Sequence, residues 1–174
     1  MNAFPRAAGL CAVVGGALRI ADSFTAGLLS PQALAALYFI TDVLLLAGIA
    51  GLWAWHRVTL LAGALGLGVA MLGLLIVRAS AFGLGSYQLG ATVTLLGLTI
   101  YAVDALARRS TPPWAPLAWL IALALGVLGT AGFAPAAMTA AAGVAFGLGF
   151  VAAGLDMLRR AAIGADRDLD RHVA

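Results

Sequence analysis

The sequence predicts an all-helical membrane protein, and three observations support this prediction. Of 174 residues, 63% are hydrophobic and only 10% are charged, with a mean hydropathy of +1.05, more apolar surface than a water-soluble core of this size needs. Apolar stretches follow one another, each long enough to cross a bilayer. Short segments rich in Gly, Pro, Ser or Arg separate them. We therefore expect one polytopic bundle of six transmembrane helices.

Helix-entry signals mark several of the expected spans. Ser30 before Pro31 and Thr111 before Pro112 each place a capping hydroxyl ahead of a proline at the first helical position, and Ser86 can cap the fourth span. No A-x-A-like cleavage site follows the first span, so it is read as a helix and not as a signal peptide. The expected spans are Pro5–Ser23, Pro31–Ala54, Val58–Ala79, Tyr87–Ala107, Pro112–Ala131 and Pro135–Leu158.

The arginines predict the orientation of the bundle. With six spans both termini lie on one side, and the opposite side carries only Arg19 and Arg78. This bias places both termini in the cytoplasm. All basic residues are Arg and all acidic residues are Asp, which together with abundant Ala, Gly and Leu indicates a GC-rich bacterial genome and hence the bacterial inner membrane. Residues 163–174 alternate charges and are expected to form a solvated, frayed cytoplasmic tail. The arginines on the terminal side are Arg6, Arg57, Arg108, Arg109, Arg159, Arg160, Arg167 and Arg171.

The chain matches itself at an offset of 81 residues without a gap. Seven glycines coincide, where random placement gives about one, and the run 66–78 matches 147–159. We expect two three-helix repeats, 1–81 and 82–162, related by a pseudo-two-fold axis in the membrane plane because three spans invert the second copy. The small residues of the third and sixth spans should pack tightly in the core or near this axis.

Asp42 is the main candidate site residue. It lies about 16 Å along the second span from Pro31, near mid-membrane, and its repeat counterpart is Leu123. A charged side chain there costs about 3 kcal/mol or more, so the carboxyl group is protonated, paired or hydrated. Expected partners are Arg19, Tyr38, Thr41 and the hydroxyls of the fourth span. The interpretations left open are a proton or cation site and a protonated, hydrogen-bonded structural residue.

Further polar residues complete the candidate set. Thr94, Tyr101 and Asp104 share one face of the fourth span with two glycines and Arg108, and this face must point into protein or water. Asp104 can form an i to i+4 pair with Arg108 at the interface. In the first span, Arg19 and Asp22 lie one turn apart and can pair.

Arg78 and Asp156 are given structural interpretations, whereas Asp22 stays in the candidate set. Asp22 has a rough repeat counterpart in Asp104, at an offset of 82. Arg78 is expected to extend to the outer interface, and Asp156 to pair with Arg159 or Arg160.

The residue inventory excludes several classes of protein. A single cysteine, Cys11, excludes an internal disulfide, a CxxC redox pair and a cysteine metal cluster, and the absence of Lys excludes a retinal Schiff base. His56 and His172 do not suit a bis-histidine haem site. We expect no cofactor, no metal site and no nucleic-acid partner. The expected partners are the lipid bilayer, a small amphipathic or lipid ligand, and either a second copy or a partner membrane subunit.

Three functions stay open at this stage. The first is a transporter or ligand-binding membrane protein for a small or amphipathic solute, with Asp42 as its protonatable site. The second is an intramembrane enzyme acting on a lipid or isoprenoid substrate, with Asp42 as general acid and neighbouring aromatic side chains lining an apolar pocket. The third is a structural or regulatory membrane subunit without a site of its own.

Overall fold

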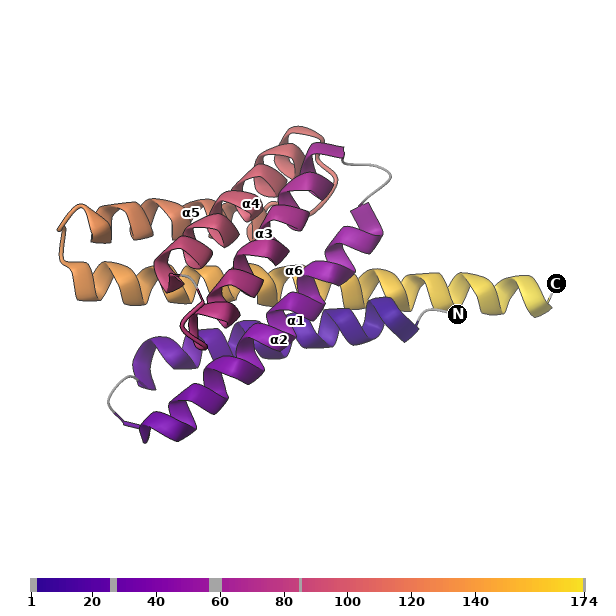
Figure 1. The fold of residues 1–174 in the computed structure, drawn as a ribbon. Helices are drawn as coiled ribbons and strands as arrows, with labels where there is room; N and C mark the ends of the chain where they lie inside the picture. The colour runs from indigo at the N-terminus through magenta and orange to yellow at the C-terminus, as the bar shows by residue number, and fades with distance from the viewer. Residues whose placement is uncertain (1–2, 26–27, 57–60, 85, 174) are drawn as a thin grey trace.

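The computed structural model is an all-helical bundle, as predicted (Figure 1). It describes residues 3–25, 28–56, 61–84 and 86–173, with the backbone alone for 164–173. No strand occurs in these ranges. The helices are α1 (Ala3–Thr25), α2 (Pro31–His56), α3 (Leu61–Ser80), α4 (Tyr87–Ala107), α5 (Trp114–Thr130) and α6 (Pro135–Val173).

The helices have the length and surface that a bilayer requires. Five of the described helices are long and apolar enough to span it, and α5, with 17 residues, reaches about 26 Å. Large apolar side chains such as Leu72, Ile100 and Ile121 are exposed along the helix sides, where water would make them costly and lipid does not. The chain is therefore a multi-pass membrane protein.

Two of the three expected helix caps are present. The amide of Ala33 donates to Oγ of Ser30 at 3.3 Å, and the amide of Leu89 donates to Oγ of Ser86 at 3.5 Å. The expected cap at Thr111 is wrong, because α5 begins only at Trp114. A second proline, Pro113, follows the first and disfavours helical backbone at the residue before it, so the helix starts two residues later than expected.

The end of α6 also differs from the expectation. The expected span stops at Leu158 and the tail at 163–174 was expected to fray, but the helix continues to Val173. The segment beyond Leu158 contains no proline, and its Asp and Arg residues do not oppose a solvated helix. With 39 residues α6 is about 58 Å long and projects well past the rest of the bundle (Figure 1).

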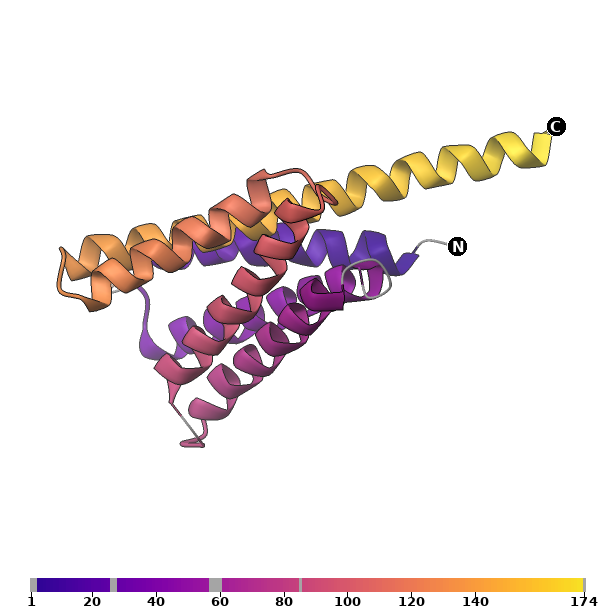
Figure 2. The same cartoon turned by 90° about the horizontal axis from the view of Figure 1, so that it is seen from above.

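The bundle is built from two closely packed helix pairs, α1 with α6 and α3 with α4 (Figures 1 and 2). The two pairs cross each other, α2 lies against α1 and α3, and α5 lies against α6 and α4. Both termini lie at one end of the bundle, which we call the proximal end (Figure 1). The turns between α1 and α2, α3 and α4, and α5 and α6 lie at the other, distal end.

Glycines set the distance between the helices of each pair. A methyl carbon added at Gly16 would lie 2.5 Å from the carbonyl oxygen of Gly147, and one at Gly66 would lie 2.6 Å from that of Gly97. The small-residue stripe of α3 thus packs on α4 and that of α6 on α1, and α3 and α6 make no contact in the described residues. At an offset of 81, the α1/α6 contacts Gly16–Gly147 and Gly9–Gly154 correspond to the α4/α3 contacts Gly97–Gly66 and Gly90–Gly73.

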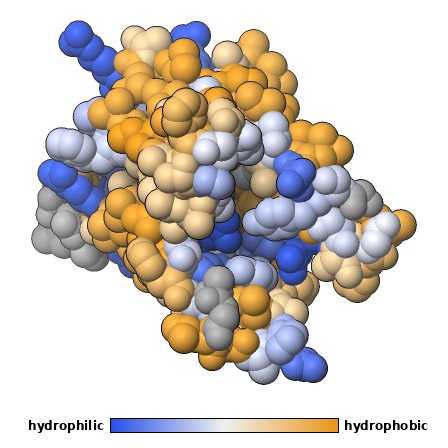
Figure 3. Space-filling model, turned by 90° about the vertical axis from the view of Figure 1, so that its left-hand side faces the viewer, coloured by the Kyte–Doolittle hydropathy of each residue, from blue (hydrophilic) through white to orange (hydrophobic). Residues whose placement is uncertain are grey.

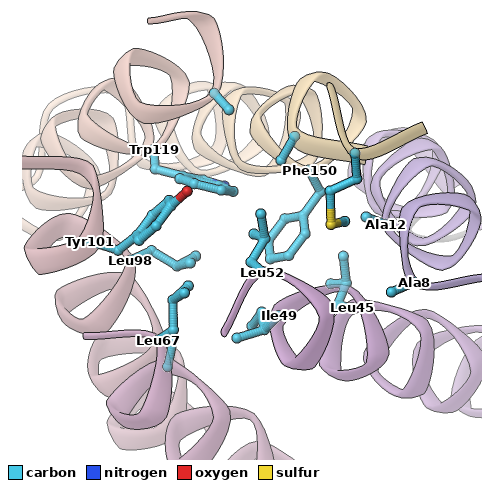
Figure 4. Close-up of a cluster of buried hydrophobic side chains, with 14 of the residues drawn as sticks. Ala8, Ala12, Leu45, Ile49, Leu52, Leu67, Leu98, Tyr101, Trp119 and Phe150 are labelled. Atoms are coloured by element: carbon cyan, nitrogen blue, oxygen red, sulfur yellow. The ribbon is translucent and has the colours of Figure 1, made fainter. Parts of the chain in front are cut away.

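An aromatic core fills the space between the two pairs. The ring of Trp119 packs edge-to-face on Tyr101, with centroids 5.8 Å apart, and on Phe150, with centroids 5.3 Å apart. Figure 4 shows these side chains converging from α4, α5 and α6, with Leu67 and Ile49 on the opposite side of the cluster. This packing closes the middle of the bundle and leaves the two ends as the places where polar groups gather.

Candidate functional site

The first polar group lies at the distal end, where α1 and α2 run antiparallel. A methyl carbon added at Gly15 would lie 3.1 Å from the amide nitrogen of Leu45, which fixes the register of the two helices. One turn further along α1 lies Arg19, and the next turn brings Asp22 of α1 level with Tyr38 of α2. Three of the residues predicted from the sequence are therefore brought together by this one interface.

Asp42 is paired with an arginine from α3. Nε of Arg78 lies 2.8 Å from Oδ2 of Asp42, and the two side chains are 24% and 15% exposed. At this distance the attraction between the two opposite charges holds the pair. The guanidinium also lies over the ring of Phe39, with its carbon 5.7 Å from the ring centroid.

Arg78 is the partner that the sequence reasoning missed. It was expected to extend to the interface, and Asp42 was expected to pair with the first or fourth span or with its own helix. The sequence does indicate this pairing, because α2 and α3 follow one another in the chain and run antiparallel, so residues equally far from their connection lie at similar depth. Asp42 lies 14 residues before His56 at the end of α2, and Arg78 lies 17 residues after Leu61 at the start of α3. The two side chains are thus separated by about one helical turn, which a long arginine side chain can bridge.

Asp22 is the most buried charged group in the part of the chain that the structure describes. Its side chain is 1% exposed, and its nearest cation is Nη1 of Arg19 at 3.8 Å. Neither carboxylate oxygen accepts a hydrogen bond from a described residue. A carboxylate in this position is costly unless a positive charge or a proton compensates it.

These groups form one electrostatic unit, which we call the distal cluster. Asp42 experiences the charges of Arg78, Arg19 and Asp22, and Tyr38 experiences those of Asp22 and Arg19. With both carboxyl groups ionised, two negative and two positive charges cancel. Figure 3 looks onto this end of the molecule and shows hydrophilic residues set back at the centre of the face, with hydrophobic residues around them. The members of the distal cluster are Arg19, Asp22, Tyr38, Asp42 and Arg78.

The remaining predicted residues lie outside the distal cluster, on α4. Thr94 is buried, and its hydroxyl donates to the carbonyl of Gly90 at 2.9 Å. Tyr101 is buried in the aromatic core. Asp104 pairs with Arg108 at 2.7 Å as expected, and its Oδ2 also accepts from the amide of Gly63 at 2.8 Å, which caps the start of α3. The polar face of α4 thus points into protein.

A second polar group, which the sequence reasoning did not assemble, lies toward the proximal end. Arg160 pairs with Asp156 at 3.0 Å, donates to the carbonyl of Ser110 at 3.2 Å and lies over the ring of Trp55 at 5.5 Å. The buried ring of His56 lies close by and experiences both charges of this pair. Because His56 ends its span, the sequence offered no reason to place it in the interior.

Two spaces adjoin this proximal group. A cavity of about 30 Å³, room for about one water molecule, lies beside the aromatic core. An open groove of about 310 Å³ runs between the ends of α1, α2 and α6. The cavity lining includes Tyr101, Thr111, Trp114 and Asp156, and the groove lining includes Phe4, Trp55, Arg160 and Ala161.

Comparisons of the chain with protein-family models, with curated proteins and with solved structures find no match. The two polar groups are therefore the features of the molecule that indicate a function.

Proposed function

We propose that this chain is a transport protein of the bacterial inner membrane, with both termini in the cytoplasm, that binds a small amphipathic solute at the distal cluster. The observation that carries the proposal is the convergence of two Asp and two Arg side chains from α1, α2 and α3 at the distal end of the bundle. Under this orientation the distal cluster faces the periplasm, where the solute enters.

The energetics of the cluster support a binding role. Each charged side chain within the membrane costs about 3 kcal/mol or more, and leucine at each position would avoid that cost. A bundle that needed only packing would gain little from four such groups. Because Asp42 and Arg78 stay partly exposed, a ligand can reach both charges without unfolding a helix.

The packing of the two helix pairs supports a transport mechanism. The α1/α6 and α4/α3 contacts repeat at an offset of 81, as two inverted three-helix repeats would require. In such an arrangement, rocking of one pair against the other exposes a central site to each side in turn.

The pairing of Asp42 favours binding over acid catalysis. A general acid needs a carboxyl oxygen free to reach the reacting atoms, whereas Oδ2 of Asp42 lies 2.8 Å from Nε of Arg78 and is occupied by that pairing. Asp42 is therefore assigned as a charged ligand-binding group together with Arg78, and the enzyme interpretation receives no support from this geometry.

A ligand screen on matched variants tests the proposal. Thermal unfolding of the protein in lipid nanodiscs is measured with small carboxylates, amines and zwitterions that carry an apolar group. Compounds that stabilise the wild type should fail to stabilise Arg78→Gln, each protein being compared with its own ligand-free value. Arg160→Gln is the control, since it removes a similar ion pair at the other end of the bundle. Equal stabilisation of wild type and Arg78→Gln would overturn the proposed site.

A further inference from the structure

The carboxyl group of Asp22 is buried in the distal cluster but takes no part in the proposed ligand binding by Arg78 and Asp42. Its side chain is 1% exposed, yet neither oxygen accepts a hydrogen bond from the residues that the structure describes. The guanidinium of Arg19, at 3.8 Å, is beyond hydrogen-bonding distance and is itself 29% exposed. The buried carboxylate is therefore poorly compensated, and binding of a proton or a cation would stabilise it.

The surroundings of Asp22 favour a proton over a metal ion. The groups that act on it are Arg19 on its own helix and Tyr38 and Asp42 on α2. Arg78 acts through Asp42, and Tyr87 of α4 acts through Tyr38. The part of α6 that packs on α1 beside Ser23, around Gly143, contains no titratable residue, and α5 contains none in its length. No group of three or more His, Cys, Asp or Glu ligands occurs among the described residues, whereas a proton needs only one carboxyl oxygen.

Protonation of Asp22 changes the charge of the distal cluster. With both carboxyl groups ionised the cluster is neutral, and uptake of one proton by Asp22 leaves a net charge of +1. Arg19 then loses its closest counter-ion, while Arg78 stays beside Asp42 and against the ring of Phe39. The protonated cluster is thus suited to an anion with an apolar or aromatic body, which would restore neutrality.

We propose that Asp22 binds the proton coupled to the binding of a small organic anion, whose carboxylate is held between Arg19 and Arg78. This inference rests on the proposed transport function and specifies its substrate class and its coupling ion. The step is a simple protonation: the Asp22 carboxylate gains one proton from the aqueous side to become the neutral acid, and no electron is transferred. Binding of the anion and of the proton favour each other by the same factor.

The test uses sodium benzoate as the probe and benzyl alcohol as its neutral analogue, on the full-length protein in lipid nanodiscs. Benzoate affinity of the wild type should fall about tenfold per pH unit once Asp22 is ionised, because one proton accompanies each anion. Asp22→Asn mimics the protonated group and should bind benzoate with the affinity of the wild type at low pH, independently of pH. Asp22→Glu, which keeps a carboxyl group, should show the pH dependence of the wild type. Benzyl alcohol, which carries no charge, should bind with an affinity that does not depend on pH.

Infrared difference spectroscopy assigns the proton directly. Addition of benzoate to the wild type should produce a carboxylic-acid carbonyl band that is absent in Asp22→Asn and retained in Asp156→Asn. If benzoate binds but the band persists in Asp22→Asn, or the affinity of that variant still depends on pH, the assignment of Asp22 is overturned while the proposed site stands. If a pH-dependent band disappears in Asp22→Asn but benzoate does not bind, the proton site stands and the organic-anion substrate class is overturned.

Discussion

Substitution of Gly66 by alanine tests how much the close contact between α3 and α4 contributes to the free energy of unfolding. The added carbon would lie 2.6 Å from the carbonyl oxygen of Gly97 and 2.8 Å from the amide nitrogen of Tyr101, and both are backbone atoms that cannot turn away. To restore an ordinary contact of about 3.4 Å, α3 and α4 must separate by roughly 0.8 Å. Such overpacking costs about 1–3 kcal/mol, of which the better helix propensity of alanine recovers at most about 1 kcal/mol.

The same calculation applies to Gly147, the residue 81 positions later. Its added carbon would lie 2.5 Å from the carbonyl oxygen of Gly16, so its alanine variant should be destabilised to a similar extent. Gly68 is the matched control, since nothing lies within 4 Å of the position where its carbon would be and alanine should be neutral or slightly stabilising. Thermal unfolding in detergent should show losses on the order of 2–6 °C for the first two variants. Equal stability of the Gly66 and Gly68 variants would refute the reasoning.

Three further predictions follow from the charged groups. Asp42→Leu leaves Arg78 unpaired and should lower the free energy of unfolding by about 1–3 kcal/mol. The double variant Asp42→Leu/Arg78→Leu should recover most of this loss. A double variant less stable than either single variant would show that the pair itself is needed for folding. Asp104→Ala removes the cap on α3 and should cost about 1 kcal/mol by thermal unfolding, and a neutral result would mean that water replaces the cap. In a background lacking the native cysteine, an impermeant thiol reagent applied to intact cells should label a cysteine at Leu84 and leave one at Ile163 unlabelled, and the reverse pattern would invert the orientation.

Within the candidate site, the sequence identified acidic groups better than their partners. Asp42 and Asp22 are visible as carboxylates inside apolar spans, because hydrocarbon makes any such group exceptional. The partner of Asp42 could not be chosen with the same certainty, since several arginines and hydroxyls lie at comparable depth. His56 was overlooked for the opposite reason: a histidine at the end of a span is ordinary, and only the tertiary structure buries its ring beside that of Tyr101.

The sequence by itself determined the helical class, the approximate spans and the set of acidic residues inside the membrane. Each of these follows from local rules: the bilayer thickness sets the length of a span, proline and serine mark where helices begin, and charge within hydrocarbon is rare. The tertiary structure alone decided which helices form the close pairs, and so whether Asp22 would be left without a hydrogen-bond donor. Those outcomes depend on the register and crossing of helices far apart in the chain, where glycines allow backbones to approach, and local sequence patterns do not specify either quantity.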